Sequence, residues 1–204
     1  MIKNIILDVG RVLVAWQPKD AMRELGFNED TIEEVARALF DTGAWDETDR
    51  GVMSNEEILA LMVSHAPAYE KEIYSFWNHV DRAIGQFSYT REWIKGFRKN
   101  GYHVYILSNY GSWTYEKTKD TALNFLEDVD GALFSYEVKQ IKPEPEIYQT
   151  LFEKFQLVPE ECVFLDDLAA NIEGARKAGM HGIVFENWEK ANEILRTEYQ
   201  IDYQ

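Results

Sequence analysis

Short apolar runs, rich in β-branched and aromatic residues, constrain the fold of this chain more than any other feature. Four clear runs lie at residues 5–7, 103–107, 162–165 and 182–185, and a weaker fifth lies at 131–134. Each is nearly continuous rather than alternating with polar residues. Alternation is typical of a strand with one solvated face, whereas continuous runs are typical of parallel strands buried on both faces. We therefore expect these runs to form a parallel sheet.

Segments of helical length separate the runs in the second part of the chain. They lie at residues 92–100, 113–125, 145–155, 169–178 and 189–199. Gly101 and Gly179 stand just beyond two of them, and glycine is the usual residue after the end of a helix. Strands that alternate with helices predict an α/β fold, with a Rossmann-like parallel sheet and helices on both of its faces.

Residues 16–88 interrupt this alternation, because they contain no strand-like run. The helices expected there lie at 20–25, 30–40, 55–65 and 69–80. Ser54 and Glu57 resemble a capping box at the start of the third helix. We expect an α/β core made of residues 1–15 and 89–204, with residues 16–88 inserted after the first strand as a small helical unit. Ligands bind at the carboxyl ends of strands in such sheets, so the insertion would cover the site.

The composition excludes several classes of function. The 36 acidic residues outnumber the 21 lysines and arginines, and the formal net charge is −15. This charge repels phosphate backbones and anionic lipids, so we expect neither a nucleic-acid partner nor a membrane partner. The single cysteine, Cys162, excludes an internal disulfide. Together with the absence of a signal-peptide core, it favours a cytoplasmic location, and a monomer is the default expectation.

Polar residues stand where the expected strands end. They are Asp8, Ser108, Asn109, Lys142, Asp166 and Asp167. Taken singly, each has a structural explanation as a turn residue, a helix cap or a solvated side chain. Parallel strands, however, bring their carboxyl ends to one edge of the sheet. We therefore expect these side chains to converge.

Converging carboxylates require compensation. Three aspartates within a few ångströms cannot all stay ionised unless a cation neutralises them or their pKa values rise. An all-oxygen set of ligands favours a hard ion, and Mg²⁺ often keeps waters and a substrate phosphate in its coordination shell. Lys142 adds positive charge, and Ser108 and Asn109 add donors for anionic oxygens. The pattern predicts a magnesium-assisted site for a small phosphorylated metabolite.

The same residues carry a family resemblance. Four motifs, at residues 7–13, 107–109, 141–148 and 164–167, resemble in sequence and order the motifs of the haloacid dehalogenase (HAD) superfamily. The insertion lies where that superfamily places a helical C1-type cap on its HAD-like core. Within the superfamily, the chain is similar to bacterial phosphatases that act on sugar phosphates such as α-D-glucose 1-phosphate. It also resembles the amino-terminal phosphatase domains of epoxide hydrolases.

The resemblance implies a role for each of these residues. Asp8 would attack phosphorus and form an aspartyl-phosphate that water then hydrolyses. The ligands of Mg²⁺ would be Asp8, the backbone carbonyl of Gly10, Asp167 and, directly or through water, Asp166. The phosphoryl oxygens would be held by Ser108, Asn109 and Lys142. The resemblance thus implies a phosphomonoesterase, with a sugar phosphate as the substrate class.

Gly10 departs from the usual pattern of the superfamily's phosphatases, in which a second aspartate at this position acts as general acid and base. A missing general acid typically costs about 10²–10⁴ in rate. We therefore expect either a good leaving group or a proton donor from the cap. Two alternatives stay open: a 2-haloacid dehalogenase in which Asp8 attacks carbon without a metal, and a phosphate-binding or interaction module that has lost catalysis. The pair Asp166 and Asp167 favours phosphoryl transfer over dehalogenation.

Two features of the insertion have two interpretations each. Trp16, Trp45 and Trp77 form either a wall on which a sugar stacks or, as we favour, the core of the helical unit. Residues 45–51 either face the site and contact substrate hydroxyls or form a solvated loop.

Overall fold

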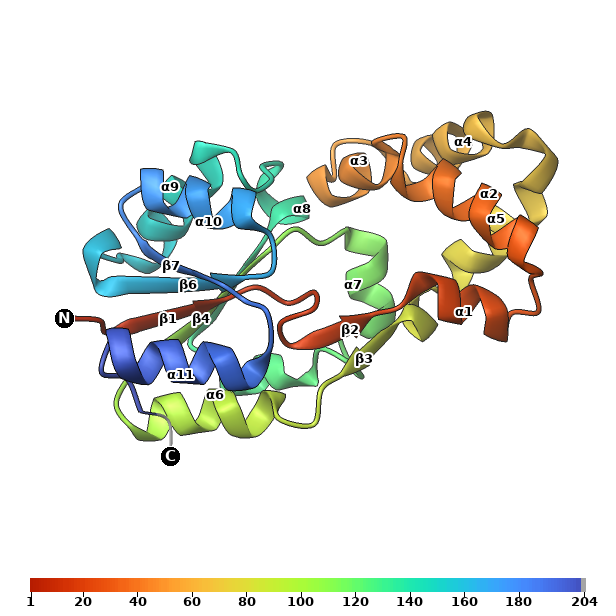
Figure 1. The fold of residues 1–204 in the computed structure, drawn as a ribbon. Helices are drawn as coiled ribbons and strands as arrows, with labels where there is room; N and C mark the ends of the chain where they lie inside the picture. Colours follow the sequence, from red (N-terminus) through yellow and green to blue (C-terminus); the bar gives the residue numbers. More distant parts are fainter. Residues whose placement is uncertain (203–204) are drawn as a thin grey trace.

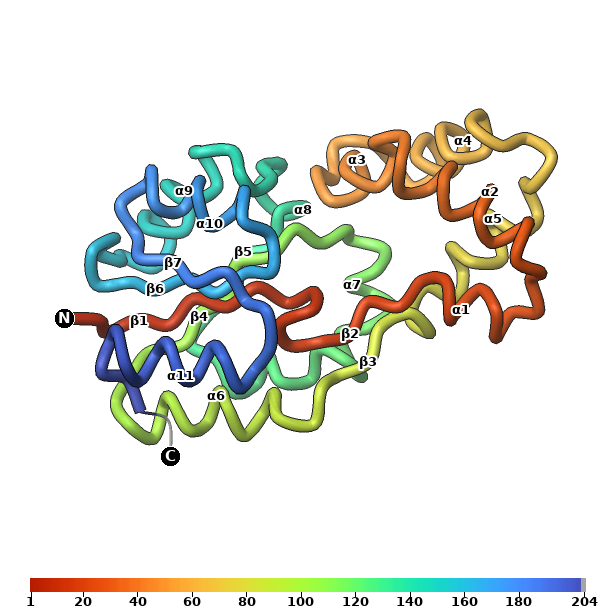
Figure 2. Tube along the Cα trace, viewed as in Figure 1, coloured from red at the N-terminus to blue at the C-terminus, as the bar shows by residue number. Residues whose placement is uncertain are grey.

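The computed structural model describes residues 1–202 and is built around a parallel sheet. The sheet has five strands in the order β5-β4-β1-β6-β7 (Figure 1, Figure 2). The strands are β1 (Asn4–Leu7), β4 (His103–Ser108), β5 (Gly131–Phe134), β6 (Cys162–Asp166) and β7 (His181–Val184). Each apolar run of the sequence therefore contributes a strand, and the predicted Rossmann-like α/β fold is confirmed.

Both faces of the sheet are buried, which explains the continuous runs. Ile5 and Leu7 of β1 belong to one hydrophobic cluster, whereas Ile6 between them belongs to another. The helices over the first cluster are α6 (Thr90–Lys99) and α11 (Trp188–Glu198). Those over the second are α9 (Pro145–Phe155) and α10 (Ala169–Lys177). Since successive side chains point to opposite faces, each position of such a strand must be apolar.

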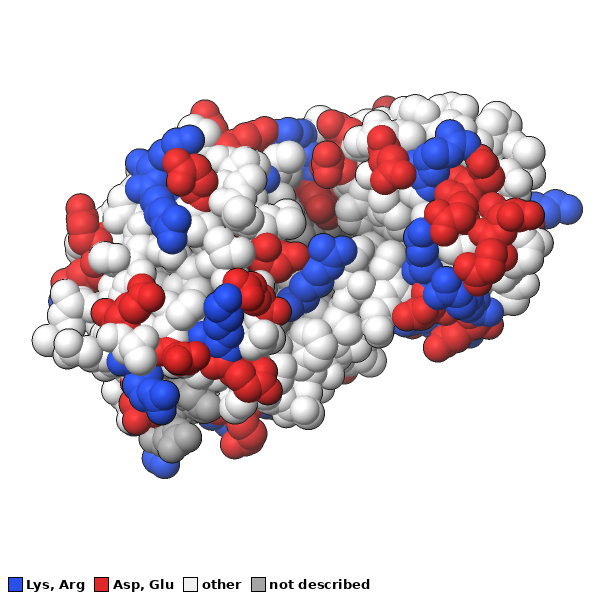
Figure 3. Space-filling model, in the orientation of Figure 1, with Lys and Arg blue, Asp and Glu red and all other residues white. Residues whose placement is uncertain are grey.

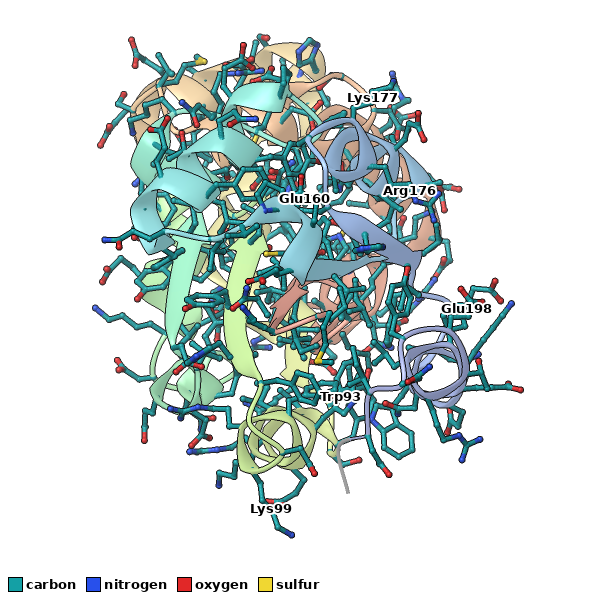
Figure 4. All side chains as sticks on the ribbon, turned by 90° about the vertical axis from the view of Figure 1, so that its left-hand side faces the viewer. Trp93, Lys99, Glu160, Arg176, Lys177 and Glu198 are labelled. Atoms are coloured by element: carbon teal, nitrogen blue, oxygen red, sulfur yellow. The ribbon has the colours of Figure 1, made fainter. Side chains whose placement is uncertain are left out.

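A view along the sheet shows the helical layers on its two sides (Figure 4). Trp93 of α6 points into the interior, and its indole nitrogen donates a hydrogen bond of 2.8 Å to Asn192 Oδ1 of α11. Lys99, Lys177 and Glu198 point away from the interior. The two helices of this layer are thus joined by packing and by a hydrogen bond.

The insertion forms a second helical body beside the carboxyl ends of the strands (Figure 1). Its elements are α1 (Pro18–Glu24), α2 (Glu29–Phe40), α3 (Ala44–Arg50), α4 (Asn55–His65), η1 (Pro67–Tyr69), α5 (Glu70–Asn78) and η2 (Val80–Ala83). They enclose a hydrophobic cluster of their own. The predicted capping box is present, because Ser54 Oγ accepts from the Glu57 backbone at 3.2 Å while Glu57 Oε2 accepts from the Ser54 backbone at 2.8 Å.

Two local features differ from the expectations. A short antiparallel ribbon of β2 (Val14–Trp16) and β3 (Ile84–Gln86) joins the insertion to the sheet, and three-residue strands are too short to show periodicity. The helix expected at 113–125 ends early, as α7 (Ser112–Thr118), and is followed by η3 (Asn124–Asp128). Thr121 Oγ1 donates to the Thr118 carbonyl at 3.3 Å, and such local bonds compete with helix continuation.

The remaining short elements are α8 (Ser135–Val138), which follows β5, and η4 (Pro159–Glu161), which precedes β6. Within residues 1–202, none of the helices combines the length and the apolar character that crossing a bilayer requires.

Candidate active site

The predicted site residues meet at the carboxyl end of the central strand. Asp8 directly follows β1, which lies between β4 and β6. The Asp8 backbone N–H donates to the Leu165 carbonyl at 3.0 Å, so the ladder holds Asp8 at the very end of the strand. From β1 the chain builds β4 and β5 on one side and then β6 and β7 on the other. Open α/β sheets bind their ligands at this kind of reversal.

Lys142 lies between two buried carboxylates. Its Nζ is 2.8 Å from Asp8 Oδ1 and 2.6 Å from Asp166 Oδ2. It also donates to the Leu107 carbonyl at 3.1 Å, so its three donors have three acceptors. The side chains of Lys142 and Asp166 are 1% and 0% exposed. One ammonium thus compensates two carboxylates only in part, which leaves one negative charge in the group.

This imbalance perturbs the protonation of the site. Burial, opposed by Lys142 and reinforced by Asp166, raises the pKa of Asp8 to about 6. Burial alone would lower the pKa of Lys142, but Asp8 and Asp166 outweigh it and raise that pKa. Burial and then Asp166 also raise the pKa of Asp167, against the effect of Arg11. A further cation beside these carboxylates would therefore stabilise their ionised forms.

The carboxylates are placed as a metal site requires. Ligand oxygens of Asp8, Asp166 and Asp167 all lie within 4.8 Å of one another. Asp166 already accepts from Lys142, from the Leu168 backbone at 2.8 Å and from Asn171 Nδ2 at 3.0 Å. Asp167, in contrast, is half-buried and is contacted by Arg11 Nη1 at 3.3 Å. An all-oxygen set of this kind fits Mg²⁺.

Ser108 and Asn109 occupy different places at the end of β4. The buried Ser108 side chain lowers the pKa of Asp8 against the effect of burial, and its Oγ donates to the Asn109 carbonyl at 3.4 Å. The Asn109 amide is engaged with the Lys142 backbone: Nδ2 donates to the carbonyl at 3.0 Å, and Oδ1 accepts from the N–H at 2.8 Å. Asn109 therefore fixes the loop that carries Lys142, and it also lines the cavity described next.

A cavity of about 260 Å³ opens between the sheet and the insertion. Figure 3 shows the surface hollowed between these two parts of the molecule. The lining residues from the strand ends and their loops include Asp8, Gly10, Arg11, Asn109, Tyr110, Thr114, Lys142, Asp167 and Asn171. Those from the insertion and the ribbon include Ala15, Trp16, Trp45, Asp46, Asp49 and Ile84. The site is thus built by both parts of the chain.

The two open questions on the insertion have distinct answers. Residues 45–51 are not a solvated loop, since they form most of α3, whose Trp45, Asp46 and Asp49 line the cavity. Trp77 is a buried core residue, as favoured, and its ring stacks on that of Trp113. Trp16 and Trp45 pack against each other, with ring centroids 5.2 Å apart, and also line the cavity. These two residues thus pack within the helical unit and also face the cavity, so the stacking of a sugar on them stays a prediction.

Several lining residues were not singled out from the sequence. Tyr110 and Thr114 follow Asn109 at the start of α7, and Asn171 holds Asp166 through bonds to both carboxylate oxygens. A sequence signal exists for the Tyr110 region, because Gly111 comes next and a Cβ there would lie 2.4 Å from Thr48 Cγ2 of α3. Glycine at such a point marks the close approach of another chain segment.

Comparisons with known proteins agree with this geometry. The chain is 29% identical over 201 residues to D-ribitol-5-phosphate phosphatase of Bacteroides thetaiotaomicron, covering 92% of this chain and 93% of the relative. It is 33% identical over 99 residues to bifunctional epoxide hydrolase 2 of Mus musculus, covering 46% of this chain and 18% of the relative. A crystal structure of a HAD family enzyme from Bacteroides thetaiotaomicron, in complex with magnesium and inorganic phosphate, matches with a TM-score of 0.74 at 23% identity. That match covers 94% of this chain and 99% of the other.

The predicted resemblance to the haloacid dehalogenase superfamily is therefore confirmed. Residues 18–179 match the haloacid dehalogenase-like hydrolase family, so this chain belongs to that family of hydrolases.

Proposed function

We propose that this protein is a Mg²⁺-dependent phosphomonoesterase that hydrolyses a sugar phosphate or a similarly small phosphorylated metabolite through an aspartyl-phosphate on Asp8. The observation that carries the proposal is the grouping of Asp8, Asp166 and Asp167, whose ligand oxygens lie within 4.8 Å of one another, with the buried Lys142 paired to the first two. An added cation would stabilise the ionised form of such a group, and a phosphoryl group on Asp8 would sit against both Lys142 and that cation.

Each residue of the group has a separate task in this mechanism. Asp8, the Gly10 carbonyl and Asp167 would hold Mg²⁺, which supplies positive charge to the phosphoryl oxygens when it is bound. Asp166 has both oxygens engaged by protein donors, so we assign it contact through water and the positioning of Lys142. Lys142 orients the attacking carboxylate and, with Ser108 and Asn109, holds the phosphoryl oxygens.

The dimensions and lining of the cavity support a small polyol or sugar substrate. A cavity of about 260 Å³ lies just below the usual range of ligand sites and therefore suits a small ligand. Trp16 and Trp45 offer an apolar wall, while Asp46 and Asp49 offer acceptors for hydroxyl groups. The activity named for the relative from Bacteroides thetaiotaomicron, on D-ribitol 5-phosphate, supports the same substrate class.

The proposal includes the organisation of the chain. We assign residues 16–88 as the cap and residues 1–15 with 89–204 as the catalytic core. All residues invoked come from one chain, so a monomer suffices. A reducing location such as the cytoplasm suits a chain whose only cysteine, Cys162, is buried and free.

A panel of phosphate esters, assayed with and without Mg²⁺ beside Asp8→Asn, tests this function. We expect metal-dependent turnover that Asp8→Asn abolishes on every ester, while thermal unfolding shows that the variant stays folded. Halide release from 2-haloacids that persists in excess chelator would favour the dehalogenase alternative. A wild-type protein that neither turns over any ester nor binds beryllium trifluoride at Asp8 would favour the interaction module.

A further inference from the structure

Position 10 leaves the proposed reaction without a proton donor beside the nucleophile. Gly10 lines the cavity, and within residues 1–202 no heavy atom beyond its two chain neighbours lies within 4 Å of the point where a Cβ would stand. No side chain replaces the missing one from the immediate neighbourhood. The leaving-group oxygen must therefore receive its proton from elsewhere in the wall of the cavity.

Four carboxyl groups of the described residues line that wall, and three of them are unsuited to this task. Asp8 is the nucleophile, Asp167 belongs to the metal cluster and pairs with Arg11 at 3.3 Å, and Asp46 is exposed. Asp49 is half-buried, and within residues 1–202 its carboxyl group has no hydrogen bond or ion pair. Among the acids of residues 1–202 that line the cavity, Asp49 is thus the one that is both half-buried and without a protein partner for its carboxyl oxygens.

The end of α3 is fastened to the core on both sides of Asp49. The Asp49 carbonyl accepts a hydrogen bond of 2.6 Å from Ser135 Oγ, a fully buried hydroxyl. On the preceding side, Thr48 packs closely on Gly111 at the start of α7. These contacts fix the backbone from which the Asp49 side chain enters the cavity.

The following residues complete the attachment. Arg50 donates two hydrogen bonds to the Glu144 carboxylate, at 2.8 and 3.1 Å, in the segment that also carries Lys142. Gly51 adopts a φ of +67°, and a Cβ there would lie 2.9 Å from Tyr136 Cα. The backbone next to Asp49 is therefore tied to the segment that carries Lys142, and both residues line the same cavity.

The surroundings of Asp49 favour its protonated form. Burial and then the Asp46 carboxylate raise its pKa to about 8, with Asp8 adding to the effect and Lys142 opposing it. The other titratable or charged groups around the cavity are Arg11, Tyr110 and Asp167. Arg11 is paired with Asp167, and the Tyr110 hydroxyl lies 3.0 Å from Thr118 Oγ1. At neutral pH the Asp49 carboxyl group therefore carries a proton that it can donate.

We propose that Asp49 is the general acid and base of the reaction, and that the cap thereby supplies what Gly10 lacks. This inference rests on the proposed phosphatase function. In the first step, an Asp8 oxygen bonds to phosphorus, the bond from phosphorus to the leaving-group oxygen breaks, and that oxygen takes the proton of Asp49. In the second step, the Asp49 carboxylate takes a proton from water as the water oxygen bonds to phosphorus. The phosphorus–Asp8 bond then breaks, and Asp49 is again protonated.

Leaving-group dependence tests the proposal. We expect Asp49→Asn to lower kcat/KM on D-glucose 6-phosphate by about 10²–10⁴, because an alkoxide needs a proton to leave. On p-nitrophenyl phosphate, whose leaving group departs as a stable anion, the loss should be small. Glu47→Gln, on the same helix but outside the lining of the cavity, is the matched control and should retain turnover on both esters. Asp46→Asn should move the alkaline limb of the profile on D-glucose 6-phosphate to lower pH, since Asp46 raises the pKa of Asp49.

Two further measurements keep the test independent of the folding of one variant. The wild-type kcat/KM on D-glucose 6-phosphate should fall above pH about 8, the value for Asp49, while that on p-nitrophenyl phosphate should not. Gly10→Asp in the Asp49→Asn background should recover part of the lost activity, because the space beside Gly10 is open.

The outcomes separate this proposal from the proposed function. If Asp8→Asn is inactive but the kcat/KM of a folded Asp49→Asn falls equally on both esters, or on neither, Asp49 is not the acid and the phosphatase function stands. If the wild-type limb above pH 8 is the same for both esters, Asp49 is again excluded. If the wild type hydrolyses no phosphate ester, or Asp8→Asn remains active, the proposed function itself fails.

Discussion

Replacing Lys142 by methionine should create a defect in stability that depends on pH. Lys142 Nζ is the ammonium within 3 Å of both Asp8 and Asp166, whose side chains are 10% and 0% exposed. Methionine retains most of the volume but removes the charge. Removing one partner of a buried ion pair costs about 3–5 kcal/mol, because the other charge stays buried without compensation. We expect a loss of this size in the free energy of unfolding at pH 8 without metal.

The sign of the pH dependence follows from Asp8. Its pKa in the folded protein is about 6, above the ordinary 3.8, even with Lys142 present, and without Lys142 it must rise further. A carboxyl group with a raised pKa favours the folded state fully below its unfolded pKa, and this contribution is lost as the pH rises through the folded pKa. The defect of Lys142→Met should therefore be largest above pH 7 and shrink towards pH 5.

Urea unfolding of both proteins at pH 5 and pH 8, in excess chelator, measures this difference. Lys177→Met serves as the control, because Lys177 is 75% exposed and contacts Glu173 only at 3.6 Å, so little change is expected at either pH. Adding Mg²⁺ at pH 8 should return part of the lost stability, since binding to the folded state alone stabilises it. A defect below about 1 kcal/mol at pH 8, or an equal defect at both pH values, would refute the electrostatic reasoning.

Three further predictions concern the metal, the cap and Asp49. Excess chelator should abolish phosphate-ester hydrolysis, and Mg²⁺ should raise the midpoint of thermal unfolding of the wild type more than that of Asp167→Asn. Gly51→Ala should cost about 1–3 kcal/mol of unfolding free energy and lower turnover of alkyl phosphates, because its φ is +67° and its Cβ would meet Tyr136 at 2.9 Å. Gly26→Ala, with a φ of +87° and open space around it, should show only the backbone cost. At pH 9 the wild-type protein must keep Asp49, whose pKa is about 8, ionised in a half-buried place, which destabilises the folded state, whereas asparagine carries no charge. Asp49→Asn should therefore raise the free energy of urea unfolding at pH 9 by about 1–3 kcal/mol, after allowance for partial exposure.

The floor of the site, formed by Asp8, Lys142, Asp166 and Asp167 at the strand ends, could be predicted from the sequence because it depends on local patterns. A strand buried on both faces must be a continuous apolar run, and the first polar residue after it marks the edge of the sheet. Asp8 and Asp166 were found in this way. Lys142 lies farther from its strand, and the motif around it, rather than periodicity, indicated its place. The strand order was not predicted, since several orders bring the same residues to one edge.

The roof of the site, formed by Trp45, Asp46 and Asp49 of α3, could not be predicted in this way. Helix α3 (Ala44–Arg50) has only Ala44 and Trp45 as apolar residues, too few to show a helical period. It is stabilised instead by contacts with distant segments, such as Arg50 with Glu144, residues separated by 94 positions. A local sequence pattern cannot predict a contact between residues so far apart in the chain.

The separation of floor and roof also decides which acids are charged. Lys142 and the proposed metal ligands lie at the strand ends, where positive charge favours the anionic forms of the carboxylates. Lys142 is engaged by Asp8 and Asp166, so its effect on Asp49 is smaller than that of burial and of Asp46. A position on the cap wall would thus keep the proposed proton donor, Asp49, neutral in a cavity whose strand-end side carries ionised groups. An aspartate at position 10 would lie beside Lys142 and the proposed Mg²⁺, and these cations would lower its pKa and favour loss of its proton. This is a physical reason why a chain with Gly10 would use an acid from the cap.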